Sequence, residues 1–261
     1  MKHRSFDVLG NVVVVNFPDD MKSVGRRKFA GMILKDNKSV RTVLAKVGKF
    51  KGRLRKMETL WVAGEKTKEV LYKENGCSFR FNIDTTYFSP RLSNERKEIA
   101  GKIKKGDEVL VMFAGVAPFS IVIAKNSGAR KVFSNEINRE ANKYAKLNVE
   151  LNNLKSRVEL LPGDAKRIAV ELAKQKKKFD VVVMPRPQLR DSFLKEAFAV
   201  SKKGTRIYYY DFCDADKTEE IVEKIKIEAS RAKKKIKIAK VKSAGEIGPY
   251  KIRCRIDFIV G

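Results

Sequence analysis

The second part of the chain alternates short apolar runs with longer amphipathic segments. The apolar runs predict strands at residues 108–113, 131–136, 157–161, 179–184, 205–211, 234–243 and 251–259. Amphipathic stretches predict helices between the first five strands, near 118–127, 138–152, 164–177 and 189–202. Strands joined by helices are typical of an α/β domain with a parallel sheet. The last two strands have no helix between them, which predicts an antiparallel hairpin.

The first 86 residues have a different pattern. They predict a strand at 11–17, a helix at 21–35 and a hairpin at 69–83, whose Asn-Gly pair suits a tight turn. We therefore expect a small α+β domain over 1–86 and an α/β domain over 87–261. Five alternating strands followed by a hairpin are the layout of a class I S-adenosylmethionine-dependent methyltransferase, with a Rossmann-like, seven-stranded sheet.

The charge of the chain indicates a polyanionic partner. Its 261 residues include 58 Lys and Arg against 31 Asp and Glu, a formal net charge of +27. Such a charge favours nucleic acid as the partner, although a solvated lysine-rich surface would give the same count. Residues 45–56 hold six basic residues in 12 and predict a phosphate-contacting loop, in which we place RNA contacts at Lys49, Lys51, Arg53 and Arg55. The lysine-rich stretch 231–242 fits better a strand with a solvated basic face.

The sequence lacks the features of membrane, secreted, disulfide-rich and zinc-binding proteins. No run approaches the roughly 20 apolar residues of a membrane helix, and the first residues do not read as a signal peptide. Three cysteines without a CxxC pair and a single histidine encode neither a disulfide framework nor a zinc site. We expect a soluble, cytoplasmic, monomeric protein without a metal.

A nucleoside cofactor is predicted at the first strands of the α/β domain. Residues 109–128 form a strand, a turn with Gly115 and a helix, although Ala117 stands where GxGxxG would have its second glycine. Glu136 closes the next strand, where a carboxylate can accept both hydroxyls of a ribose. Asp164 follows the third strand and either caps a helix or binds an adenine amino group. NAD would satisfy these features too, but the terminal hairpin favours S-adenosylmethionine.

Six segments resemble one known family. They are TYFSPRLSNERKEI (86–99), MFAGVAPFSI (112–121), NEIN (135–138), LNVELNNL (147–154), GDA (163–165) and GPYKIRCRIDF (248–258). In order and spacing they are similar to the archaeal and eukaryotic tRNA (guanine-37 N1)-methyltransferases. The resemblance implies S-adenosylmethionine as cofactor and the anticodon stem-loop of tRNA as partner. It implies that the cofactor is bound by Phe113, Gly115, Ala117, Glu136, Ile137, Asp164, Ala165 and Pro185.

Methylation of guanine N1 needs a general base and a cation, because N1 must lose its proton while negative charge builds on O6. Arg91 and Glu95 lie four residues apart at the start of a predicted helix (91–103), a spacing that also suits an ordinary ion pair. By resemblance Glu95 is the general base, and Arg91 orients it or contacts the nucleotide. Arg55 would stabilise O6; Arg53 competes for that role, and phosphate binding is the alternative for both.

One departure from the family pattern bears directly on recognition of the target base. Family members commonly carry an Asn that can bind the target base after the fourth strand of the domain, where this chain has Pro185 followed by Arg186. Because proline has no side-chain amide and no backbone N–H, base recognition must use other groups, among which we name Arg186. Two alternatives therefore stay open: a wyosine-pathway aminocarboxypropyltransferase using the same cofactor, and a non-catalytic RNA-binding relative.

Overall fold

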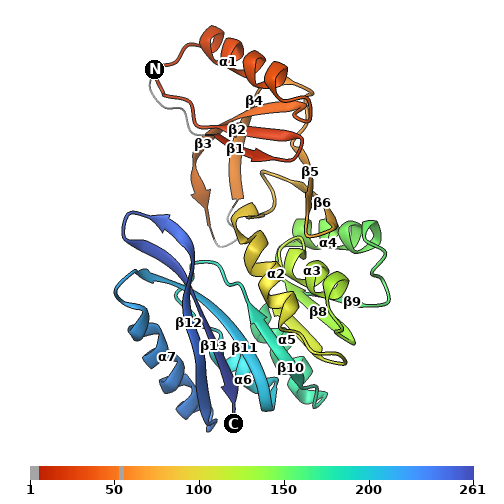
Figure 1. The fold of residues 1–261 in the computed structure, drawn as a ribbon, viewed down its shortest axis with the longest axis vertical. Helices are drawn as coiled ribbons and strands as arrows, with labels where there is room; N and C mark the ends of the chain where they lie inside the picture. Colours follow the sequence, from red (N-terminus) through yellow and green to blue (C-terminus); the bar gives the residue numbers. More distant parts are fainter. Residues whose placement is uncertain (1–5, 53–55) are drawn as a thin grey trace.

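A computed structural model describes residues 6–52 and 56–261. It contains a four-stranded sheet at the N-terminal end, a two-stranded hairpin, and a seven-stranded sheet with helices on both faces (Figure 1). The predicted α/β class, with a Rossmann-like seven-stranded sheet and a small α+β part before it, is confirmed.

The N-terminal sheet has the order β1-β2-β3-β4, with β1 Phe6–Leu9, β2 Val12–Val15, β3 Thr42–Lys51 and β4 Lys56–Gly64. Helix α1 (Ser23–Asp36) connects β2 to β3, which pair in parallel. All four valines of β2 are buried, since Val13 and Val15 pack with α1 while Val12 and Val14 face the hairpin and the larger domain. The predicted strand and helix are confirmed, but residues 45–51 belong to β3 and are not the expected loop.

The hairpin joins β5 (Glu69–Glu74) to β6 (Cys77–Asn82). Its turn has Asn75 and Gly76 at φ 48° and 70°, as a two-residue hairpin turn of the predicted kind requires. The hairpin packs on the larger domain, where the side chain of Asn148 accepts from the Arg80 backbone N–H (2.7 Å) and donates to its carbonyl (3.1 Å). The domain boundary at residue 86 stays a prediction.

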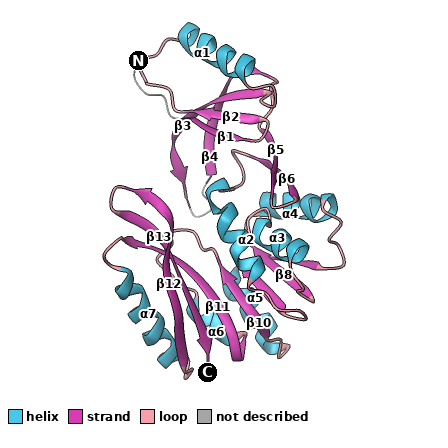
Figure 2. Ribbon diagram, viewed as in Figure 1, coloured by secondary structure: helices cyan, strands magenta, loops and turns pink. Residues whose placement is uncertain are grey.

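The large sheet has the order β12-β13-β11-β10-β7-β8-β9. Its strands are β7 Glu108–Met112, β8 Lys131–Glu136, β9 Val158–Pro162, β10 Phe179–Met184, β11 Ser201–Asp214, β12 Ile236–Gly248 and β13 Lys251–Val260. The first five are parallel, and β13 and β12 are antiparallel (Figure 2). All seven predicted strands are present.

Helices cover both faces of this sheet, with 3-10 helix η1 (Pro90–Leu92) leading into α2. Their bounds are α2 Ser93–Gly101, α3 Pro118–Asn126, α4 Arg139–Leu151, α5 Ala165–Lys174, α6 Leu194–Ala199 and α7 Thr218–Arg231. Helix α6 is much shorter than the predicted 189–202, because Pro187 and the Arg186 contacts described below hold residues 186–191 in a loop. Helix α7, between β11 and β12, was not predicted. Its buried stripe of Ile221, Ile225 and Ala229 carries the helical spacing that would have revealed it.

Candidate active site

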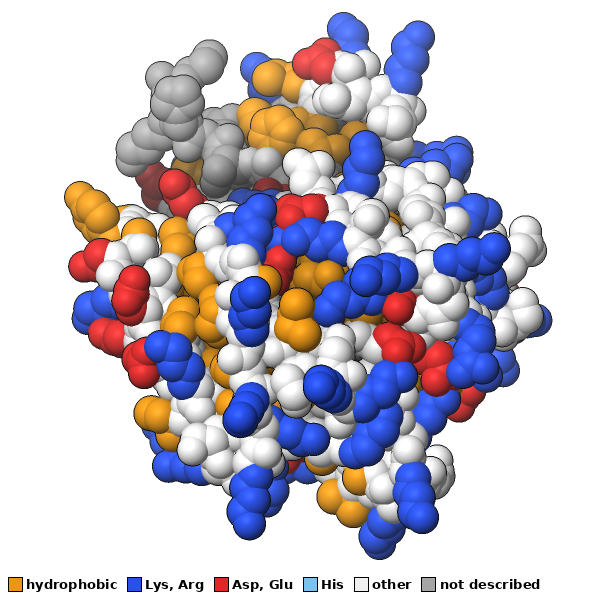
Figure 3. Space-filling model, turned by 60° about the horizontal axis from the view of Figure 1, so that its bottom comes forward, with side chains coloured by type: hydrophobic (Ala, Val, Ile, Leu, Met, Phe, Trp, Pro, Cys, Tyr) orange, Lys and Arg blue, Asp and Glu red, His pale blue; other side chains and the backbone are white. Residues whose placement is uncertain are grey.

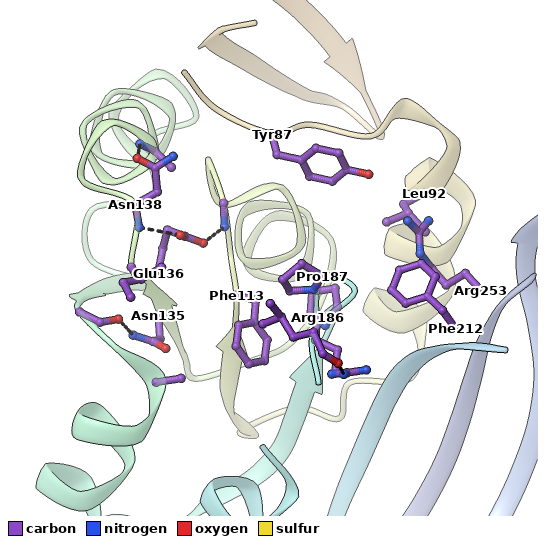
Figure 4. A pocket seen from close by; sticks show the side chains of 17 residues that line it. Tyr87, Leu92, Phe113, Asn135, Glu136, Asn138, Arg186, Pro187, Phe212 and Arg253 are labelled. Atoms are coloured by element: carbon purple, nitrogen blue, oxygen red, sulfur yellow. Dashed lines mark hydrogen bonds between the residues drawn. The ribbon is translucent and has the colours of Figure 1, made fainter. Parts of the chain in front are cut away.

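A pocket lies at the carboxyl ends of β7, β8 and β10 (Figure 4). In parallel α/β sheets this edge is where ligands bind, because the loops that follow the strands diverge there. The turn after β7 has positive φ at Phe113 (59°), Gly115 (59°) and Ala117 (68°). Ala117 therefore adopts the left-handed conformation usually given to glycine, so the missing second glycine of GxGxxG does not prevent the turn. Phe113 and Gly115 line the pocket, whereas Ala117 is fully buried below it.

Glu136 lies at one end of this pocket and organises its backbone. Its Oε2 accepts the N–H of Gly115 (2.7 Å) and its Oε1 accepts that of Asn138 (2.7 Å). One carboxylate thus joins the turn after β7 to the start of α4. A carboxylate at the end of the second parallel strand is placed to accept ribose hydroxyls.

The neighbouring wall is small and apolar. Ile137, Gly163 and Ala165 line it, and the backbone at Gly163 (φ 145°) carries no side chain toward the cavity. This shape suits a flat heteroaromatic ring. Asp164 does not line this pocket: it caps α5 by accepting the Lys166 N–H (2.9 Å) and borders an adjacent surface depression. Its predicted contact with adenine stays a prediction.

The loop after β10 forms the floor of the pocket through Pro185, Arg186 and Pro187. Arg186 is only 2% exposed; its guanidinium pairs with Asp211 and donates to the carbonyls of Leu189 (2.5 Å) and Asp191 (3.1 Å). These contacts hold the loop against β11. They favour a structural role for Arg186 over the predicted contact with RNA.

Glu95 lies in a buried cluster of charges between α2 and the antiparallel strands. Its Oε2 is 2.6 Å from Arg255 Nη1 and accepts the hydroxyl of Tyr210 (2.9 Å), while its Oε1 is 2.8 Å from Lys242 Nζ. Burial, and then the charge of Glu95, raise the pKa of Tyr210 well above its usual range, so the phenol stays protonated and donates. Arg255 is fully buried and also pairs with Glu98 (2.5 Å) and Asp257 (2.7 Å).

Arg91 points away from this cluster. It lies in η1, where the chain has not yet entered the α-helix, and its exposed side chain is 3.6 Å from Asp7 of β1. The i, i+4 spacing in a helix, which would place Arg91 and Glu95 on one face, is therefore not realised in the structure. Arg91 lines a groove between the N-terminal sheet, the connecting segment 83–91 and residues 244–247 of β12. Tyr87 and Arg253 line both this groove and the first pocket.

Comparison with known proteins places the chain in a family. Residues 70–239 match the TRM5/TYW2 methyltransferase domain, and residues 2–67 match the TYW2 N-terminal domain. The chain is 32% identical over 257 residues to the tRNA (guanine(37)-N(1))-methyltransferase Trm5b of Pyrococcus abyssi, covering 98% of this chain and 74% of the relative. The chain belongs to the TRM5/TYW2 methyltransferase family.

Solved structures agree with the family assignment. The crystal structure of Trm5b from Pyrococcus abyssi superposes with a TM-score of 0.85 at 31% identity, covering 98% of this chain and 75% of that one. The complex of aTrm5 with tRNALeu superposes with a TM-score of 0.83 at 28% identity, covering 98% and 72%. A further relative, the tRNA (guanine(37)-N(1))/4-demethylwyosine(37)-methyltransferase Taw22 of Nanoarchaeum equitans, is 30% identical over 301 aligned residues, which cover 97% of this chain and 98% of the relative.

Several predicted residues fall outside what the structure describes. Arg53 and Arg55 are among them, as are the side chains of Lys49 and Lys51 in β3. Their roles remain predictions. Lys and Arg side chains are spread over the face shown in Figure 3, with groups of Asp and Glu side chains between them. No helix in the described ranges has both the length and the apolar character needed to cross a membrane. Residues 6–52 and 56–261 contain no cluster of three or more His, Cys, Asp or Glu side chains suited to a metal ion.

Sequence reasoning missed the residues that the antiparallel strands contribute. Tyr210, Arg255, Phe212 and Arg253 come from β11 and β13, more than 110 residues after Glu95 in the chain. Alternation along β13 would have placed Arg253 and Arg255 on one face. Pairing with a particular carboxylate on a distant helix has no local signal.

Proposed function

We propose that this protein transfers a methyl group from S-adenosylmethionine to N1 of guanine 37 in tRNA. The observation that carries the proposal is the junction between two cavities. A pocket with the features of a nucleoside site meets, at Tyr87 and Arg253, a groove that opens under the N-terminal sheet. A base extruded from RNA in the groove can thereby reach the inner pocket, as enzymes that modify bases require.

The residues of the inner pocket fit the cofactor. Glu136 would accept the ribose hydroxyls, and Ile137 and Ala165 would enclose the adenine. Phe113, Gly115 and Pro185 line the remaining wall, where glycine leaves the backbone bare: a Cβ on Gly115 would lie 3.3 Å from the Tyr87 carbonyl. When bound, S-adenosylmethionine supplies an electrophilic methyl group on its sulfonium.

Glu95 is the general base of the proposed reaction. Its two oxygens have different partners: Oε2 is held by the fully buried Arg255 and by Tyr210, whereas Oε1 contacts Lys242, whose side chain is 26% exposed. Oε1 is thus the oxygen that can release Lys242 and accept the N1 proton of the base. Arg255 and Tyr210 keep the carboxylate in place as this happens.

The protein acts on the anticodon stem-loop as a cytoplasmic monomer, with Arg91 in the groove beside the RNA. Arg55, Arg53, Lys49 and Lys51 extend the RNA contact, and Arg55 adds positive charge near O6. The net charge of +27 supports a polyanionic substrate. It also predicts that tRNA affinity falls steeply with salt.

Incubation with S-adenosylmethionine and tRNA transcripts tests the proposal, with nucleoside mass spectrometry as the readout. We expect N1-methylguanosine in tRNA with G37 and no product in the A37 transcript. A third arm uses tRNA carrying 4-demethylwyosine at position 37, since Taw22 is named for both substrates. An aminocarboxypropyl adduct there would support the wyosine-pathway transferase instead. Cofactor binding without any product would support the non-catalytic relative.

A further inference from the structure

Arg253 places its guanidinium at the junction between the inner pocket and the groove under the N-terminal sheet. It is partly buried on β13, and its Cζ lies 5.2 Å from the centre of the Phe212 ring, its cross-strand partner on β11. Within the described residues the side chain of Arg253 forms this cation–π contact and has no hydrogen bond or ion pair. An arginine has five N–H donors in a planar fork. Phe212 holds the guanidinium of Arg253 in position, and its N–H donors have no acceptor among the described residues.

Arg253 belongs to the same face of the sheet as the residues that hold Glu95. In the β11–β13 register, Tyr210 lies opposite Arg255, and Phe212 lies opposite Arg253. Side chains two residues apart on a strand share a face and are separated by about 7 Å. The Tyr210–Arg255 pair binds the Glu95 carboxylate, so the next pair places an unpaired cation about one base width from it.

Two other candidates for a contact with the base, Arg186 and Pro185, are engaged elsewhere or lack a donor. Arg186 is paired with Asp211 and with loop carbonyls, and Pro185 has no donor. Glu136 lies at the opposite end of the pocket, whereas Arg253 and Phe212 lie beside Leu92 (Figure 4). Leu92 precedes Glu95 by three residues. Arg253 therefore lies at the end of the pocket away from the ribose site. We call this the acceptor end, because the base that accepts the methyl group would lie there.

We propose that Arg253 donates to the O6 and N7 edge of the target guanine and stabilises the charge that develops on O6. A guanidinium matches these two acceptors in a bidentate arrangement. In the reaction, the N1–H bond breaks and the proton goes to Glu95. N1 then bonds to the methyl group as the carbon–sulfur bond breaks and its electron pair stays on sulfur. While this occurs, part of the negative charge of the base lies on O6. A cation next to O6 is therefore most effective in stabilising the transition state.

The inference rests on the proposed function, and the experiment separates the two. Single-turnover methylation is measured for wild type, Arg253→Gln and Arg253→Lys on tRNA with guanosine, 7-deazaguanosine or 6-thioguanosine at position 37. We expect Arg253→Gln to be about 100-fold slower than wild type on guanosine. Arg253→Lys keeps the charge but loses the fork, and we expect a loss of about 10-fold. Lys251→Gln, which removes one charge from the same strand, serves as the control and keeps its rate.

The base analogues show whether the contact is direct. Wild type should discriminate against both analogues, because each lacks or weakens one acceptor, and Arg253→Gln should lose most of that discrimination. The dissociation constant of S-adenosylhomocysteine, measured by calorimetry, should be unchanged, which also shows that the variant is folded. An Arg253→Gln variant with full rate, or with undiminished discrimination, overturns the inference. Weakened cofactor binding instead assigns Arg253 to the cofactor's carboxylate, while a wild type without product means that the proposed function itself has failed.

Discussion

The two ends of the inner pocket are built in different ways. At the cofactor end, one carboxylate, Glu136, accepts backbone N–H groups from two turns that lie within 25 residues of sequence. Near the acceptor end, Glu95 is not among the residues that line the pocket, and it is held by Arg255, which lies 160 residues away along the chain. The cofactor end is a local structure. The acceptor end exists only when the antiparallel strands have docked on α2.

This difference predicts different consequences of mutation. Changes at the cofactor end should weaken ligand binding and leave the fold intact, because the turns are also held by the parallel strands. Changes at the acceptor end should affect catalysis and stability together, since buried charges that lose a partner are costly. Variants at each end can confirm or break this distinction.

The largest expected effect is on catalysis by Glu95→Gln. The amide keeps the shape and can still hydrogen-bond, but it cannot take the N1 proton, so we expect the single-turnover rate to fall about 1,000-fold. The rate is measured with saturating cofactor and tRNA. Glu98→Gln, in the same charge cluster one turn along α2, is the control and should lose less than 10-fold. A Glu95→Gln enzyme with wild-type rate would remove Glu95 as the base.

Arg255→Met should give the largest loss of stability. It leaves Glu95, Glu98 and Asp257 without their shared buried cation, and we expect the free energy of unfolding to fall by about 3–5 kcal/mol. Urea unfolding followed by far-ultraviolet circular dichroism measures the change. Arg231→Met removes an exposed ion pair with Glu228 and should cost less than about 0.5 kcal/mol. Equal losses in the two variants would mean that the cluster contributes no more than a surface pair.

Features that depend on residues close together in the chain could be predicted from sequence, and features that depend on distant residues could not. The strands of the large sheet, the turn with Gly115 and the carboxylate of Glu136 follow from patterns within 30 residues, and the structure has all of them. Helix α7 was recognisable from its apolar stripe but was missed. The partners of Glu95 and the placement of Arg186 depend on strand pairing and burial, which a local pattern does not encode. Arg186, expected at the RNA, is instead held by Asp211.

At the cofactor end, Glu136→Ala should weaken S-adenosylhomocysteine binding about 30-fold, because the pocket loses the ribose acceptor and the link between Gly115 and Asn138. Calorimetry gives the dissociation constant, and the urea midpoint should shift little. Asp164→Asn provides the matched control: this residue caps α5 outside the pocket, so the dissociation constant should stay within about twofold. If Asp164→Asn weakened binding as much as Glu136→Ala, the adenine contact expected for Asp164 would gain support and the outline of the pocket would need revision.

The smallest expected effect concerns the edge of the acceptor cluster and its dependence on pH. The hydrogen bond from Arg255 lowers the pKa of Glu98 from 4.5 to about 2, and Lys242 acts in the same direction. Because the folded-state pKa lies below the unfolded one, Glu98 stabilises the fold above pH 4.5, and this contribution is lost as the pH falls toward 2. Its side chain is 32% exposed, so solvent screening reduces the effect to about 1 kcal/mol.

Urea unfolding of wild type and Glu98→Gln at pH 6, 4 and 3 measures this contribution. We expect the difference between their free energies of unfolding to become smaller as the pH falls. Glu171→Gln, whose partner Arg167 is 3.6 Å away on an exposed helix face, should give a difference that is small at every pH. A wild type to Glu98→Gln difference independent of pH would mean that Arg255 is bound essentially by the buried Glu95 and Asp257, and that the cluster ends there.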